Sequence, residues 1–259
     1  MSTIPSPRAR IHFLDELRGL CVLLMVAHHA LYTVGFLFNN DLCKAAFHFF
    51  EPVFSPVFAS LFFIICGISC HLSHNNRLRG LKLLGVALGM SAVLYFVMYD
   101  AMIWFGVLHM LACSILICAA LTPLARRIPG WVGMLVCALL FLLFAHWPYM
   151  GASSGYFEGG YFGIPGVFEW YWPSAWQKLT YLNPLGIGAL RSADYYPLLP
   201  WTFVVLFGMF LGKYTDRFPR FMYKRHAPPL SWMGRYAIVA YIAHQPVIYG
   251  VCWLISLLA

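Results

Sequence analysis

Apolar segments of about 20 residues recur along this chain, and they constrain its fold more than any other feature. A helix of that length spans the roughly 30 Å hydrocarbon core of a bilayer. Backbone N–H and C=O groups find no water in lipid, so each segment must satisfy them internally. We therefore predict an all-α, polytopic bundle of about seven or more membrane helices. The predicted spans are 20–38, 52–72, 81–99, 103–121, 131–149, 198–214 and 236–258.

The overall composition agrees with a membrane protein rather than a soluble domain. Hydrophobic residues make up 61% of the chain and charged residues 10%, whereas soluble domains are about 25% charged. No composition shift marks a boundary between soluble domains, so we predict one membrane domain over 1–259. The segment 151–197 is rich in Gly, Pro and aromatic residues, and we interpret it as a long loop with interfacial or re-entrant pieces.

Basic residues predict the orientation of the chain in the membrane. They gather in alternate connections, which the positive-inside rule places in the cytoplasm. The opposite connections are acidic or mixed, so we predict a cytoplasmic N-terminus. The net charge of +8 then reflects orientation and gives no support for nucleic-acid binding. The basic residues concerned are Arg8, Arg10, Arg77, Arg79, Lys82, Arg126, Arg127, Lys213, Arg217, Arg220, Lys224 and Arg225.

The stretch 10–29 joins a cluster of ionisable residues to an apolar segment that ends in two histidines. An ionisable side chain inside a membrane helix is costly and is by default a candidate for function. Helical positions 11 apart point almost the same way, so Arg18 and His29 share a stripe. Asp15 and Thr33 lie on the same stripe, whereas His28 faces elsewhere. Two interpretations remain open: His29 is a reactive group supported by Asp15 and Arg18, or Asp15 pairs with Arg18 at the helix mouth while His29 hydrogen-bonds a neighbouring helix.

Among the other histidines inside predicted spans, which include His71, two have neighbours that suggest a polar pocket. His109 follows Gly106, where a neighbouring backbone can approach closely. His244 and Gln245 precede Pro246, which removes a helical hydrogen bond and frees a carbonyl. Each histidine is either part of a polar pocket for substrate or a structural residue satisfied by its neighbours.

The segment 191–201, RSADYYPLLPW, lies at the outer entrance of a predicted span. Asp194 is a carboxylate that could bind a sugar amine or hydroxyl, with Tyr195 and Trp201 beside it. The alternative is an interfacial aromatic belt with a helix entry shaped by proline.

Several motifs, in order, resemble a known family. They are LDELRGL at 14–20, FFIICGIS at 62–69, FGVLH at 105–109, ADYYPLLPW at 193–201 and MGRYAIVAYIAHQPV at 233–247. Together they are similar to the catalytic domain of heparan-α-glucosaminide N-acetyltransferase and its bacterial relatives, within the transmembrane acyltransferases. The combination of ADYYPLLPW with the last motif is the most specific part of the resemblance.

The resemblance implies acetyl or acyl transfer from cytoplasmic acetyl-CoA to an extracytoplasmic sugar or glycan, with a histidine as the reactive centre. His29 matches the histidine that related acyltransferases carry in their first helix, and His48 is a rival that matches the lysosomal branch. Relatives often carry an aspartate four residues after that first histidine, where this chain has Thr33. Arg235, in the last motif, is grouped with Asp194, Tyr195, Trp201, His109, His244 and Gln245 as an acceptor-side residue.

The donor implied by the resemblance is anionic, and guanidinium groups suit its phosphates. The candidates are Arg8, Arg10, Arg18, Arg77, Arg79, Arg126 and Arg127, although membrane orientation already explains the same residues. A histidine with an ordinary pKa near 6.5 could act as a base or accept the acyl group itself. The sequence does not choose between direct transfer and an acyl-histidine intermediate.

Two other function classes remain as alternatives. A transporter or flippase would move a polar lipid or glycan through the histidine-lined interior without using acyl-CoA. A haem-binding electron carrier would use two of His29, His109 and His244 as axial ligands. The eight cysteines contain no Cys-x-x-Cys, so we predict no metal site. We place the protein in a bacterial cytoplasmic membrane, with the lipid bilayer as a partner and a homodimer left open.

Overall fold

The computed structural model describes residues 10–99, 102–144, 180–186 and 194–258, and within these ranges every element is a helix. The all-α prediction is therefore confirmed for this part of the chain. The α-helices are α1 (His12–Tyr32), α2 (Asp41–Leu72), α3 (Asn76–Val97), α4 (Val107–Arg127), α5 (Gly130–Phe144), α6 (Leu198–Leu211), α7 (Pro228–Arg235) and α8 (Ala237–Leu258). Short helices are the π-helix η1 (Thr33–Leu37) and the 3₁₀ helices η5 (Thr180–Leu185), η6 (Gly212–Arg217) and η7 (Arg220–Tyr223).

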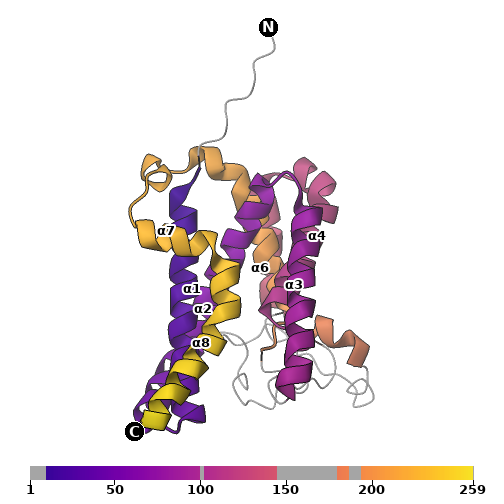
Figure 1. The fold of residues 1–259 in the computed structure, drawn as a ribbon. Coiled ribbons are helices and arrows are strands. Elements are labelled where there is room, and N and C mark those ends of the chain that lie inside the picture. The colour runs from indigo at the N-terminus through magenta and orange to yellow at the C-terminus, as the bar shows by residue number, and fades with distance from the viewer. Residues whose placement is uncertain (1–9, 100–101, 145–179, 187–193, 259) are drawn as a thin grey trace. The chain divides into compact units, whose positions relative to one another are not determined.

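The helices belong to two compact units, which Figure 1 draws in one chain and which are described separately here. Unit 1 comprises Met1–Phe58 and Asp216–Ala259, so it combines both ends of the sequence. Unit 2 comprises Ala59–Thr215. The boundary between the two units falls inside α2.

Five helices in the described residues are long and apolar enough to cross a membrane. They are His12–Leu37, Asn76–Val97, Val107–Arg127, Leu198–Arg217 and Ala237–Leu258, and each corresponds to a predicted span. The predicted spans 52–72 and 131–149 contain the shorter apolar helices Val57–Leu72 and Gly130–Phe144, and residues 145–149 lie outside the described ranges. The count of seven spans stays a prediction.

The ends of two helices differ from the sequence prediction. The span predicted at 103–121 is wrong at its start, because Phe105 forms an isolated bridge with Tyr195 and is extended. The N–H of Tyr196 donates to the carbonyl of Phe105 at 3.3 Å, which holds this extended segment in place. In α1, the charged residues before position 20 are already helical, so the helix begins at His12. The predicted loop at 151–197 lies mostly outside the described residues.

In unit 1, α1 packs against both α7 and α8, and Figure 1 shows α7 crossing α1. Two glycines make the crossing with α7 a backbone-to-backbone contact. A Cβ atom on Gly19 would collide with the carbonyl of Leu230, and one on Gly234 would collide with the carbonyl of Asp15. The family motifs LDELRGL and MGR therefore meet where α1 crosses α7.

Replacing Gly234 by alanine should destabilise unit 1 by about 1–3 kcal/mol, because the new methyl group meets rigid backbone. Thermal unfolding of the purified protein in detergent measures the effect. Gly250→Ala in α8 is the matched control, since nothing lies within 4 Å of its Cβ position. Equal melting temperatures for the two variants would contradict this account of the crossing.

In unit 2, glycines also set the closest helix contact. A Cβ on Gly67 of α2 would collide with the carbonyl of Val205, and one on Gly208 of α6 would collide with the carbonyl of Ile64. Beside this crossing, Trp201 is 1% exposed, and its ring centroid lies 5.4 Å from that of Phe63. Within unit 2, α3 packs on α4, α5 packs on α6, and α4 packs on α6.

Candidate functional site

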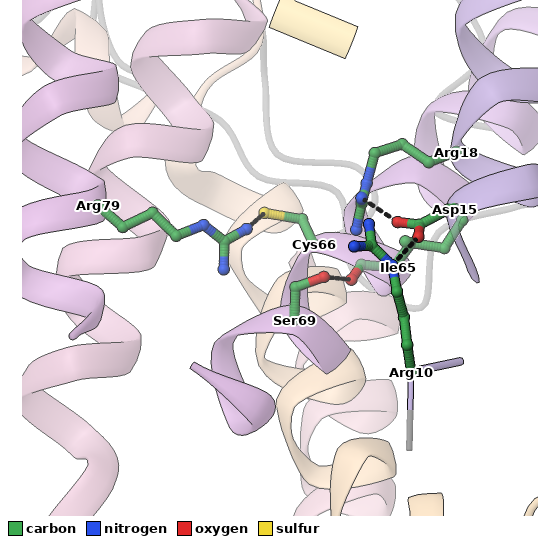
Figure 2. Close-up of polar contacts among 7 residues, drawn as sticks. All are labelled: Arg10, Asp15, Arg18, Ile65, Cys66, Ser69 and Arg79. Atoms are coloured by element: carbon green, nitrogen blue, oxygen red, sulfur yellow. Dashed lines mark hydrogen bonds and ion pairs between the residues drawn. The ribbon is translucent and has the colours of Figure 1, made fainter. Parts of the chain in front are cut away.

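The carboxylate of Asp15 lies at the N-terminal end of α1 between two arginines of the same unit (Figure 2). Nε of Arg10 donates to Asp15 Oδ2 at 2.8 Å, and Nη1 of Arg18 donates to Asp15 Oδ1 at 3.2 Å. Asp15 is only 7% exposed, so the two guanidinium groups neutralise a buried charge. This is the Asp15–Arg18 pair of the structural interpretation, although the hydrogen bond that His29 makes is to Met25 of its own helix.

The neighbouring carboxylate, Glu16, was missed as a site residue by the sequence reasoning. Glu16 Oε1 accepts the backbone N–H of His226 at 2.7 Å and that of Ala227 at 2.9 Å. Both N–H groups belong to the two residues immediately before α7, which begins at Pro228. Glu16 is 5% exposed and is thus a buried carboxylate that holds the segment entering α7 from a distant part of the sequence. The only signal in the sequence for this role of Glu16 was the adjacent Asp-Glu pair in LDELRGL.

The histidines of α1 and α8 lie side by side within unit 1. The ring centroids of His29 and His244 are 4.8 Å apart, and the rings are inclined at 70°. Nδ1 of His29 lies 2.9 Å from the carbonyl oxygen of Met25. Because a carbonyl only accepts, Nδ1 carries the proton, and Nε2 of the neutral ring presents a lone pair. The structure thus brings together two residues that the sequence could only place on separate helices.

One turn further on, a second polar contact joins the same two helices. The hydroxyl of Thr33 donates to Oε1 of Gln245 at 3.2 Å, and Thr33 is fully buried. Thr33 is also the first residue of the π-helix η1, and π-helical turns are frequent at functional sites. Thr33 therefore binds α8, where relatives with aspartate would place a carboxylate.

Two other histidines of unit 1 have different surroundings. The ring of His28 packs on Phe47 at 4.8 Å, which confirms that it faces away from the stripe. His48, the rival reactive residue, is exposed on α2. Its ring lies 5.6 Å from Phe36. Arg235, the last residue of α7, is also exposed.

In unit 2, Asp194 caps a helix. The N–H of Val107, the first residue of α4, donates to Asp194 Oδ2 at 2.9 Å. A Cβ on Gly106 would collide with the same carboxylate, so glycine is needed for this approach. A negative charge at a helix N-terminus is stabilising. The geometry gives Asp194 a structural role whether or not it also binds an acceptor.

His109 is enclosed by its own hydrogen-bond network and is 3% exposed. The N–H of Gly106 donates to Nδ1 of His109 at 3.4 Å, so Nε2 carries the proton. Nε2 donates to the hydroxyl of Ser91 at 3.3 Å, and Ser91 donates in turn to the carbonyl of Ile103. These bonds use both ring nitrogens, which favours the structural interpretation of His109.

Of the two aromatic candidates beside Asp194, Trp201 is buried and Tyr195 is partly buried. Trp201 lies 5.4 Å from the ring of Tyr196 and forms part of the core of unit 2. Burial raises the pKa of Tyr195 well above its ordinary value of 10. Tyr195 therefore stays protonated near neutral pH and can donate a hydrogen bond but cannot act as a base.

The arginines proposed to bind the donor phosphates differ in exposure and in their contacts. Arg77, Arg126 and Arg127 are exposed. Arg79 points at α2 instead (Figure 2), with Nη2 3.6 Å from Cys66 Sγ. Arg8 lies outside the described residues. Lys213, also in unit 2, caps the C-terminus of α4 by donating to the carbonyl of Ala125 at 2.7 Å.

Comparison with known proteins identifies the family. Residues 10–246 match the family described as heparan-alpha-glucosaminide N-acetyltransferase, catalytic. No curated protein and no solved structure matches significantly. The matched region runs from the arginine beside Asp15 to the proline that follows Gln245, so it includes both partners of the histidine contact. The predicted resemblance is thus confirmed: the chain belongs to the family of the heparan-alpha-glucosaminide N-acetyltransferase catalytic domain and is a membrane protein of the acyltransferase class.

Proposed function

We propose that this protein moves an acetyl group from cytoplasmic acetyl-CoA to the amine or hydroxyl of an extracytoplasmic sugar or glycan. The proposal includes seven spans, a cytoplasmic N-terminus and a location in a bacterial cytoplasmic membrane. The observation that supports it best is the contact of His29 with His244 on two apolar helices. An imidazole in a membrane helix is costly, so two in contact favour chemistry over packing.

His29 is the reactive group in this proposal. The Met25 carbonyl holds the proton on Nδ1, so the Nε2 lone pair is available to a substrate. That lone pair can remove a proton from the acceptor or attack the thioester carbonyl. Asp15 pairs with both Arg10 and Arg18, so the support from Asp15 and Arg18 is structural: they hold the end of α1.

The donor would bind through the exposed arginines of the predicted cytoplasmic connections. Arg77 lies near the start of α3, and Arg126 and Arg127 end α4. Since α3 and α4 are consecutive helices that pack together in unit 2, these arginines are suited to the phosphates of coenzyme A. On the acceptor side we retain His244, Gln245 and, in unit 2, Asp194 with Tyr195.

Acetyl transfer in proteoliposomes tests the proposal directly. Labelled acetyl-CoA would be added to one side and glucosamine supplied as the acceptor probe, with N-acetylglucosamine measured by mass spectrometry. Production that needs folded protein, both substrates and intact vesicles is the expected result. Folded protein that consumes no acetyl-CoA would overturn the proposal, and movement of glucosamine without acetylation would favour the transporter alternative.

A further inference from the structure

The contact between His29 and His244 joins helices that are more than 200 residues apart in sequence. Both rings are held in the same way by their own helix. Nδ1 of His29 faces the carbonyl of Met25, and Nδ1 of His244 faces the carbonyl of Tyr241. Each Nδ1 therefore carries the proton, and both rings present an Nε2 lone pair.

The Nε2 atom of His244 is buried and has no hydrogen-bond partner among the described residues. Burying a polar atom without a partner costs free energy. Nε2 of His28 is also buried without a partner among the described residues, and what distinguishes His244 is its ring contact with His29 across two helices. The adjacent bond from Thr33 to Gln245 fixes α8 against the first helical segment at this level. The Nε2 lone pair of His244 is thus held beside His29, and no group in the described residues donates a hydrogen bond to it.

If His29 receives the acetyl group, it cannot also act as the base for the acceptor. Once Nε2 of His29 carries the acetyl group, that atom can no longer take a proton. The other nitrogen, Nδ1, already donates to the Met25 carbonyl. The acceptor must still lose a proton when it attacks, so a second base is needed nearby.

We propose that His29 and His244 divide this chemistry, with His29 as nucleophile and His244 as the base for the acceptor. This inference rests on the proposed acetyltransferase function. His29 Nε2 attacks the thioester carbon; the C–N bond forms, the C–S bond breaks, and the electron pair leaves on the coenzyme A thiolate. The acceptor amine then attacks the acetyl carbon, the bond to Nε2 breaks, and the electron pair returns to His29.

In that second step the proton of the amine passes to Nε2 of His244, which becomes an imidazolium ion. It then releases the proton, which balances the one that the coenzyme A thiolate takes up. The net products are the acetylated amine and coenzyme A, with both imidazoles restored. His244 is a catalytic residue in this scheme because it touches the reacting acceptor.

The test separates the two half-reactions in a His244→Phe variant, which keeps a packing ring but has no nitrogen. His28→Phe is the matched control, because the ring of His28 also lies against that of His29, at 5.5 Å, but packs on Phe47 and has no proposed role in proton transfer. Coenzyme A release from acetyl-CoA in a single turnover measures the first step, and transfer to glucosamine measures the second. Hydroxylamine serves as a second acceptor probe, since it is a strong nucleophile that needs little help from a base.

We expect His244→Phe to release coenzyme A at a rate within about threefold of the unaltered protein, and to acetylate hydroxylamine. Transfer to glucosamine should fall by about 100-fold, which is typical for loss of a general base. The control should keep both steps.

Full glucosamine transfer by His244→Phe would overturn the role of His244 while leaving the proposed function intact. Equal losses in both steps would also overturn it, because a packing defect would then explain them. Failure of the unaltered protein to acetylate either probe would remove the proposed function and this inference with it.

Discussion

Replacing His29 by alanine should lower acetyl transfer by at least about 100-fold, because the reactive imidazole contributes 10²- to 10⁴-fold in comparable acid–base roles. The loss should appear in both coenzyme A release and acetylation of the acceptor, since both steps use the same Nε2 atom. Labelled acetyl-CoA and product formation by the purified protein in vesicles measure it. Binding of acetyl-CoA, measured by calorimetry, should change little, because the proposed donor-binding arginines are elsewhere in the sequence.

His28→Ala and His48→Ala are the controls for this experiment. His28 is the adjacent residue and packs on Phe47, and His48 is exposed on α2. Both controls should retain most of the activity. An active His29→Ala protein together with an inactive His48→Ala protein would transfer the reactive role to His48, as in the lysosomal branch that the sequence comparison suggested.

The helical class and the stripe on α1 were predictable because they depend on local periodicity. The lengths of the apolar segments predicted five helices whose ends lie within a few residues of those in the structure. The exceptions are α1, which begins earlier than predicted, and α4, which begins later. Helical geometry also predicted that His28 and His29 face different neighbours, as their contacts with Phe47 and His244 confirm. These features need no knowledge of which helices meet.

The roles of the acidic residues were not predictable, because they depend on partners far away in sequence. Asp194 was interpreted as a candidate ligand for an acceptor, yet its carboxylate binds the N–H of Val107, 87 residues earlier. The carboxylate contacts at the start of α4 and just before α7 are therefore long-range. A single sequence contains no signal for such a contact, whereas capping residues within four positions of a helix start are easily found.

The family motifs around residues 14–20 and 233–235 also gain a physical meaning from the structure. Gly19 and Gly234 allow the backbones of α1 and α7 to touch. Asp15 gathers Arg10 and Arg18 at the same end of α1. In the sequence these motifs indicated only the family, whereas in unit 1 they fix one helix crossing. His29 lies 10 residues beyond Gly19, so this crossing positions the helix that carries the reactive residue.

Replacing Glu16 by alanine should weaken that crossing strongly. The change leaves the N–H groups of His226 and Ala227 without their carboxylate partner. A hydrogen bond to a charged group contributes about 1.5–3 kcal/mol, so losing two should cost about 3 kcal/mol or more. Glu16→Gln keeps an acceptor oxygen without the charge and should lose less than half as much.

Hydrogen exchange of the segment 226–235 is the measurement that isolates this effect, since it reports local opening as well as global unfolding. A loss of about 3 kcal/mol corresponds to roughly 100-fold faster exchange in Glu16→Ala. Asp41→Ala is the control, because Asp41 forms an exposed pair with Lys44 and its side chain is 93% exposed. An exposed pair contributes at most about 1 kcal/mol, so the control should leave the segment protected. If Glu16→Ala and Asp41→Ala exchanged alike, the carboxylate of Glu16 would not be what holds α7 on α1, and the backbone contacts at Gly19 and Gly234 would have to hold the crossing without it.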